Sequence, residues 1–237
     1  MDITNENVEV ITAREDKKKI VYSLIISSFA VLVLWGIKSV EEIFGLSFAG
    51  MGIYPRQVEG LKGILFSPFI HGDFSHLISN TTTLFVSLFV LLYFYRDSAY
   101  KVLLIVWFFS GLSVWWVGRE SYHIGASGVI YGLISFLFFS GIFRKDKRAI
   151  ALSLLMVFLY GGLVWGVLPI KEEISFESHL FGAVVGFICA VIFRKSDPPA
   201  KYEWEIEQEE LDSGDGVYDD IDPDEIKIDD DANPKYF

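Results

Sequence analysis

Three short segments place polar side chains within apolar stretches, and their residue types suit acyl transfer. The first segment holds His76 and Asn80, the second centres on Ser127, and the third centres on His179. A serine hydroxyl becomes a good nucleophile when a neighbouring imidazole takes its proton. Ser127 and His179 are therefore the candidate nucleophile and general base for attack on a peptide carbonyl.

The tetrahedral oxyanion formed by such an attack needs hydrogen-bond donors that are already in place. His76 and Asn80 lie four positions apart and share one face of a helix, so both can supply donors. The backbone N–H of Ser127 lies at an expected helix N-terminus, where the helix dipole favours negative charge. The sequence predicts an oxyanion site built from these three residues.

A catalytic acid is harder to find than the other groups. Only Asp73 and Glu177 flank the three segments, and both lie in loops. We therefore predict a dyad of Ser127 and His179 rather than a full triad. Tyr131, one turn after Ser127, is expected to orient the imidazole by stacking against it.

Glycines recur at helical spacing around the serine and the histidine. Small residues four positions apart let two membrane helices approach closely. We expect this packing to bring the hydroxyl and the imidazole within hydrogen-bond reach. The glycines concerned are Gly125, Gly128, Gly132, Gly182 and Gly186.

Each of these signals also has a plainer interpretation. A G-x-S-x-G string is common as helix packing, and a buried histidine often bonds a backbone carbonyl. His76 and Asn80 could form an interhelical clasp. A metal site is not expected, because the four histidines include no pair four residues apart and Cys189 is the single cysteine.

The elements that must position these residues are long apolar runs. Hydrophobic residues make up 52% of the 237 residues, and they cluster between short charged patches, as in a bundle of membrane-spanning helices. We predict an all-α membrane protein with six transmembrane helices. The runs cover residues 20–37, 77–95, 100–117, 127–143, 149–168 and 178–193.

Lysine and arginine predict the orientation of the bundle, since they favour the cytoplasmic side of a membrane. They concentrate at residues 14–19, 96–101, 144–148 and 194–195, which lie on one side. Both termini are then cytoplasmic, and the second, fourth and sixth helices enter from outside. The three polar segments share one depth, about one turn below the outer surface. The fourth helix, about 25 Å long at 1.5 Å per residue, should leave the serine in a water-filled depression.

The remaining segments have simpler expectations. Residues 1–19 form a polar cytoplasmic segment, and residues 20–195 form the membrane domain. The long apolar loop over residues 38–76 should lie partly in the outer leaflet. Residues 196–237 hold 16 acidic and 3 basic residues, and we expect a disordered cytoplasmic tail that either aids solubility or docks a cytoplasmic partner.

Taken together, the motifs resemble those of the rhomboid intramembrane serine proteases. The resemblance rests on Gly125-Ala-Ser127-Gly with Tyr131, on His179 with its two following glycines, and on His76-x-x-x-Asn80. It covers residues 20–193, and the Trp-Arg pair often found in the first long loop of that family is absent.

The resemblance implies a six-helix rhomboid fold, with Ser127 as nucleophile and His179 as base. It implies cleavage of single-span membrane proteins near small residues, with no metal or cofactor and no nucleic-acid partner, in contact with membrane lipids. A multi-pass protein of a bacterial cytoplasmic membrane fits this picture. The alternatives are a catalytically inactive rhomboid-like protein that binds membrane clients, and a small transporter.

Overall fold

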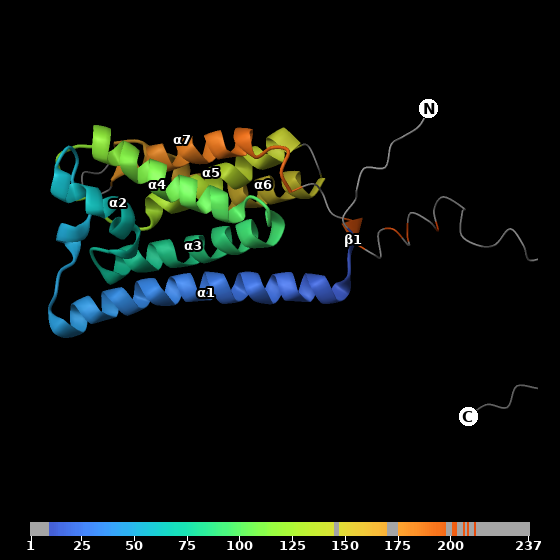
Figure 1. The fold of residues 1–237 in the computed structure, drawn as a ribbon, viewed down its shortest axis with the longest axis horizontal. Coiled ribbons are helices and arrows are strands. Elements are labelled where there is room, and N and C mark those ends of the chain that lie inside the picture. Colours follow the sequence, from blue (N-terminus) through green and yellow to red (C-terminus); the bar gives the residue numbers. More distant parts are fainter. Residues whose placement is uncertain are drawn as a thin grey trace, which may run out of the picture. The chain divides into compact units, whose positions relative to one another are not determined.

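The computed structural model describes residues 10–144, 147–169, 175–197, 201–202, 206, 208 and 211. The chain divides into two units. In Arg14–Pro199 the helices pack side by side (Figure 1). In the other unit, Met1–Ala13 with Ala200–Phe237, strand β1 (Val10–Ile11) pairs in parallel with β2 (Lys201–Tyr202). Most of the predicted acidic tail, and residues 1–9 of the N-terminal segment, lie outside the described residues.

Among the described residues, four helices are long and apolar enough to cross a membrane. Two shorter apolar helices follow them, and each predicted apolar run falls on one of the six. The prediction of an all-helical membrane protein is confirmed to this extent. The four long helices are α1 (Ala13–Phe44), α3 (Phe74–Phe94), α4 (Ala99–Val117) and α5 (Ser127–Arg144), and the two shorter ones are α6 (Lys147–Tyr160) and α7 (Phe176–Ile192).

The observed helix bounds differ from two of the predicted apolar runs. Helix α1 extends well beyond residues 20–37 because its charged flanks are good helix formers, and Lys38 pairs with Glu42 one turn later at 2.9 Å. The fifth run, predicted to reach residue 168, leaves the α-helix at Tyr160 and continues as the 3₁₀ helix η4 (Gly161–Val167). Two consecutive glycines, which favour helices poorly, begin this change.

The long segment between α1 and α3 packs against α4. It contains η1 (Ala49–Met51), η2 (Val58–Lys62), α2 (Gly63–Phe66) and η3 (Ser67–Phe69). The Trp107 indole N–H donates to the Ile64 carbonyl at 2.9 Å, and a side chain added at Gly111 would meet Ile64. This packing gives the apolar residues of the loop a protein surface to cover.

Helix α5 is the most buried of the long helices. Of its most apolar 18-residue window, 61% is buried inside the protein, against 17% for α1. Its neighbours include α3, α4, α6 and α7. The main hydrophobic cluster surrounds its middle, and members of that cluster include Leu91, Val106, Leu133, Phe136, Leu137 and Cys189.

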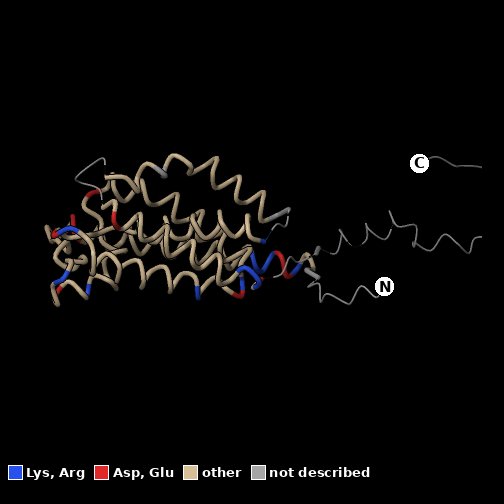
Figure 2. The backbone as a smooth tube through the Cα atoms, turned by 90° about the horizontal axis from the view of Figure 1, so that it is seen from above, with Lys and Arg blue, Asp and Glu red and all other residues tan. Residues whose placement is uncertain are grey.

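The charged residues of the helical unit gather at the helix ends. Figure 2 shows lysine and arginine concentrated at the end where α1 begins. Basic residues lie near the start of α4 and near the ends of α3, α5 and α7. The last three helices begin at the opposite end of the bundle. The three polar segments therefore start from the end with fewer basic residues.

Candidate active site

The serine lies where a tight loop becomes helix α5. Gly125 has a φ of +109°, a conformation that residues with side chains rarely adopt. Its N–H donates to the Ser67 carbonyl at 2.9 Å, which holds the loop against η3. Ser127 is the first residue of α5 and is 9% exposed. Its N–H therefore belongs to the first turn, whose donors have no partner inside the helix.

The structure brings Ser127 and His179 into direct contact. Ser127 Oγ lies 2.8 Å from His179 Nε2, and His179 Nδ1 lies 2.9 Å from the Gly166 carbonyl oxygen. Because a carbonyl only accepts, Nδ1 must carry the proton. The bare Nε2 can then accept the Ser127 hydroxyl proton, which is the tautomer that general-base chemistry requires.

Tyr131 lies flat against the His179 ring. The ring centroids are 4.1 Å apart and the planes differ by 7°. Tyr131 comes from α5 and His179 from α7, so the stack spans the same helix pair as the serine–histidine bond. Together with the Gly166 carbonyl, it fixes both the plane and the rotation of the imidazole.

Glycines let α5 and α7 approach to backbone contact. A methyl group added at Gly182 would lie 2.0 Å from the Gly128 carbonyl oxygen. One added at Gly186 would lie 2.0 Å from the Gly132 carbonyl oxygen. No real side chain fits at these distances, so the separation of the two helices depends on the missing side chains.

His76 and Asn80 lie beside the loop that precedes the serine. A methyl group added at Gly125 would meet His76 Nε2 at 2.8 Å and Asn80 Nδ2 at 3.7 Å. Asn80 is 6% exposed, and its Nδ2 has no hydrogen-bond partner among the described residues. A buried donor without a partner is costly, and here it faces the loop two residues before Ser127.

His71 supports the same loop from the other side. Its Nε2 lies 3.5 Å from the Ala126 N–H, and its ring packs edge-on against His76 with centroids 5.0 Å apart. Burial lowers the pKa of His71 to about 4, so the ring is neutral near pH 7 and can accept from that N–H.

The two acids near the polar segments have other partners. Asp73 caps α3 by accepting the His76 N–H at 2.7 Å. Glu177 accepts the Arg119 N–H at 3.3 Å and pairs with the Arg119 side chain. Neither forms a hydrogen bond with His179 among the described residues, and the third group beside the imidazole is a backbone carbonyl.

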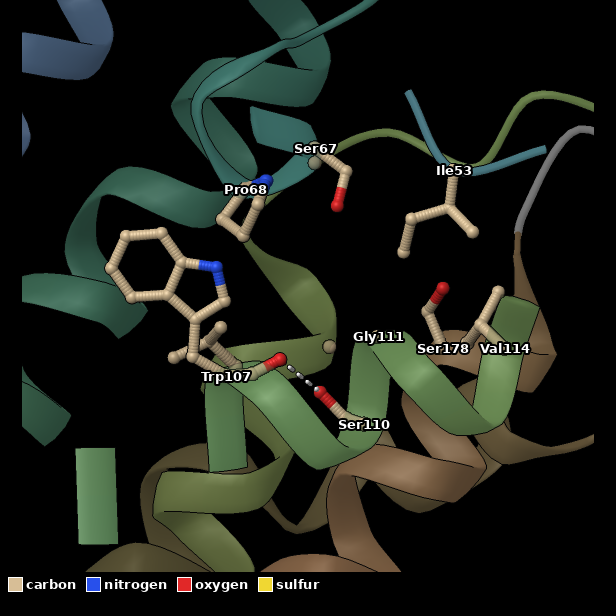
Figure 3. A pocket seen from close by; sticks show the side chains of 11 residues that line it. Ile53, Ser67, Pro68, Trp107, Ser110, Gly111, Val114 and Ser178 are labelled. Atoms are coloured by element: carbon tan, nitrogen blue, oxygen red, sulfur yellow. Dashed lines mark hydrogen bonds between the residues drawn. The ribbon is translucent and has the colours of Figure 1, made fainter. Parts of the chain in front are cut away.

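A small cavity lies beside the loop that leads into α5 (Figure 3). Its wall includes Gly125 and Gly128, which flank the Ala126–Ser127 dipeptide, and the side chains of Ser67 and Ser178. Serines and apolar residues such as Ile53 and Val129 therefore line this cavity together, and Ser127 is not part of its wall.

Gly166 and its carbonyl were missed by the sequence analysis. Any residue type can offer a backbone carbonyl, so residue identity carries no signal for this role. The structure does explain why this residue is a glycine, because a methyl group at Gly166 would lie 2.0 Å from the Tyr131 hydroxyl. His123 and Ser175, which link the loop before Ser127 to α7, were also missed.

Comparison with known proteins gives a family for this arrangement. A rhomboid domain model matches residues 59–196. Uncharacterized proteins from Mycobacterium bovis and Mycobacterium tuberculosis are each 30% identical over 180 residues, which covers 72% of this chain and 75% of theirs. A putative rhomboid protein of Acanthamoeba polyphaga mimivirus is 25% identical over 136 residues, covering 54% of this chain and 73% of its own. The matched region contains the whole Ser127–His179 contact, and the chain belongs to the rhomboid family.

Proposed function

We propose that this protein is an intramembrane serine endopeptidase in which Ser127 is the nucleophile and His179 the general base. The observation that supports this most strongly is the 2.8 Å contact between Ser127 Oγ and His179 Nε2, with Nδ1 held on the Gly166 carbonyl. A histidine kept only for packing has no need of a bare nitrogen aimed at a hydroxyl.

The proposed reaction follows from the positions of the groups. Ser127 Oγ attacks the substrate carbonyl carbon as His179 Nε2 takes its proton, and the imidazolium returns that proton to the leaving amine. A water molecule then attacks the acyl carbon while His179 Nε2 takes its proton, and the imidazolium returns that proton to Ser127 Oγ as the acyl–serine bond breaks. The Tyr131 ring and the Gly166 carbonyl keep the imidazole in place through both steps.

The negative charge on the tetrahedral oxygen needs hydrogen-bond donors near the loop that precedes Ser127. Asn80 Nδ2 and the His76 ring are candidates because both lie against Gly125. The Ser127 N–H adds a backbone donor at the start of α5. Such preorganised donors act strongly in a site from which most water is excluded.

The membrane topology is part of the proposal. We infer that α6 and α7 cross the bilayer with the four longer helices, giving six spans. The basic helix ends then face the cytoplasm, both termini lie there, and the site opens near the outer surface.

The proposed substrates are single-span membrane proteins, cut near small residues. The chemistry calls for no metal or cofactor, because a serine, an imidazole and hydrogen-bond donors supply every group it uses. Lipids of the surrounding bilayer are the other partners.

Co-expression with a model single-span substrate tests the proposal. Ser127→Ala and His179→Ala should each abolish cleavage while membrane insertion is unchanged. Asn80→Ala should lower the rate by about 10²–10³-fold, the usual cost of one oxyanion donor. Cleavage by the purified Ser127→Ala variant, or its absence with wild type and several substrates, contradicts the assignment and favours a client-binding role.

A further inference from the structure

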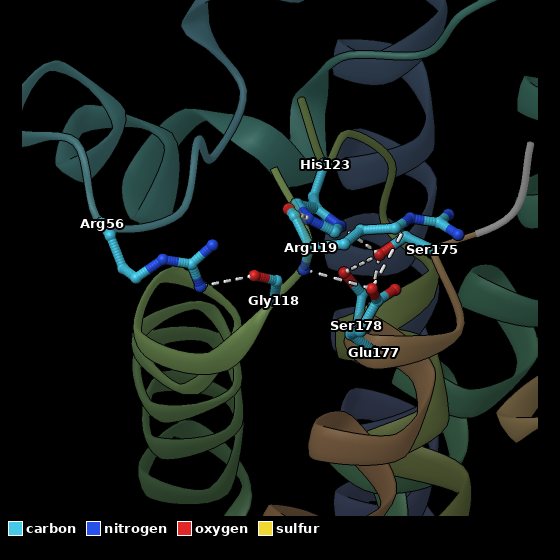
Figure 4. A network of polar contacts seen from close by, with 7 residues as sticks. All are labelled: Arg56, Gly118, Arg119, His123, Ser175, Glu177 and Ser178. Atoms are coloured by element: carbon cyan, nitrogen blue, oxygen red, sulfur yellow. Dashed lines mark hydrogen bonds and ion pairs between the residues drawn. The ribbon is translucent and has the colours of Figure 1, made fainter. Parts of the chain in front are cut away.

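A network of side-chain hydrogen bonds joins the loop before Ser127 to the first turn of α7 (Figure 4). His123 Nε2 lies 3.0 Å from the Arg119 carbonyl oxygen, and His123 Nδ1 lies 2.6 Å from Ser175 Oγ. Ser175 Oγ lies 2.7 Å from Ser178 Oγ and accepts the Ser178 N–H, which caps α7. The three side chains link two segments that are 52 residues apart in sequence.

The Arg119 carbonyl determines which nitrogen of His123 carries the proton. The Arg119 carbonyl can only accept, so His123 Nε2 carries the proton and Nδ1 accepts the Ser175 hydroxyl proton. His123 is 2% exposed, and burial lowers its pKa below the usual range for histidine. A neutral ring with one donor and one acceptor uses both of them here.

Two further contacts fix the loop in the same place. Glu177, 7% exposed on the first turn of α7, accepts the Arg119 N–H at 3.3 Å and pairs with Arg119 Nε at 3.5 Å. On the opposite side, His123 and Ile53 exchange backbone hydrogen bonds of 2.8 and 3.0 Å. His123 therefore lies between the segment that joins α1 to α3 and helix α7.

The position of these contacts relative to the dyad gives them a functional meaning. His123 precedes Ser127 by four residues, and Ser175 precedes His179 by four residues. The backbone contact of Gly128 with Gly182 sets the separation of α5 and α7 on the side of the dyad away from the loop. That contact does not reach residues 118–124, and the Gly125 N–H bond to Ser67 ties the end of the loop to η3 rather than to α7.

We propose that His123, through Ser175, is a positioning residue that holds the loop over residues 118–126 against α7 and so sets the distance between Ser127 Oγ and His179 Nε2. The inference rests on the proposed function and adds a residue to it. It assigns no contact with substrate to His123. A displacement of about 1 Å between reacting groups can cost about 10²-fold in rate.

The test is the kinetics of Ser127 labelling by a fluorophosphonate probe, on the purified full-length protein in detergent. His123→Ala and Ser175→Ala should each lower the labelling rate constant by about 10–100-fold, while the final labelled fraction stays near that of wild type. The double variant should be little slower than the slower single variant, because both break the same link. Ser175→Thr keeps the hydroxyl and the cap and should restore most of the rate.

Trp115→Phe is the matched control. It removes a 2.8 Å hydrogen bond from the Trp115 indole to the Gln57 carbonyl, which ties α4 to the segment between α1 and α3 without reaching α7. Its rate constant should match wild type.

The outcomes separate the two proposals. If wild type takes no label on Ser127, the proposed function fails. If wild type is labelled there and His123→Ala reacts at the same rate, the positioning role is wrong. A lower labelled fraction with an unchanged rate constant also overturns it, because that pattern means some molecules are unfolded and the rest are normal.

Discussion

Helices α5 and α7 meet through backbone, whereas α1 meets the bundle through side chains. Gly182 and Gly186 press against carbonyl oxygens of α5, leaving no room for a methyl group. Helix α1 is held by separate hydrogen bonds, such as Trp35 to Thr81 at 3.0 Å and Lys38 to the Gly72 carbonyl at 3.1 Å. Contacts between backbones fix a distance more firmly than contacts between flexible side chains. The serine and histidine lie on the pair whose separation is fixed in this way.

The sharpest test of this difference compares two glycines. Gly182→Ala places a methyl group 2.0 Å from the Gly128 carbonyl, so α7 must move and the dyad must open. We expect cleavage to fall by at least about 10²-fold. Gly36→Ala on α1 has nothing within 4 Å, and it should leave cleavage unchanged and favour the helix by up to about 1 kcal/mol.

Cleavage of a single-span substrate and thermal unfolding in detergent, measured on both variants, make the comparison. Similar losses in both would mean that α5 and α7 are no more constrained than α1.

A second pair of glycines tests the support of the imidazole within one 3₁₀ helix. A methyl group at Gly166 would lie 2.0 Å from the Tyr131 hydroxyl and 3.0 Å from His179 Nδ1. Gly166→Ala should therefore slow Ser127 labelling by about 10-fold or more, because both supports of the imidazole are disturbed. Gly162→Ala, with nothing within 4 Å, is the control. Equal rates for the two variants would remove Gly166 from the site.

The apolar runs, the helical class and the residues of the three polar segments could all be identified from the sequence. Side-chain chemistry is visible in a sequence, so Ser127, His179 and Tyr131 could be chosen as candidates before their geometry was known. The Gly166 carbonyl could not, because every residue has one. The end of α6 at Tyr160 was missed because residues 161–168 are as apolar as a helical span, and only the glycine pair marks the change.

The smallest expected effect concerns the attachment of α1. Trp35→Phe removes the hydrogen bond to Thr81 and keeps an aromatic ring beside Phe74, with which the indole packs at 5.9 Å. We expect a loss of about 1 kcal/mol in unfolding free energy and cleavage within about two-fold of wild type. Denaturant titration in mixed micelles measures the first quantity. A large loss of cleavage with unchanged stability would show that α1 takes part in the site.

The most direct test of the central claim is to locate the fluorophosphonate adduct by mass spectrometry in wild type and in His179→Ala. A base that activates one hydroxyl should give a single adduct on Ser127 in wild type and none in His179→Ala, although Ser127 is still present. An adduct on another residue, or equal labelling of Ser127 in both proteins, would contradict the account.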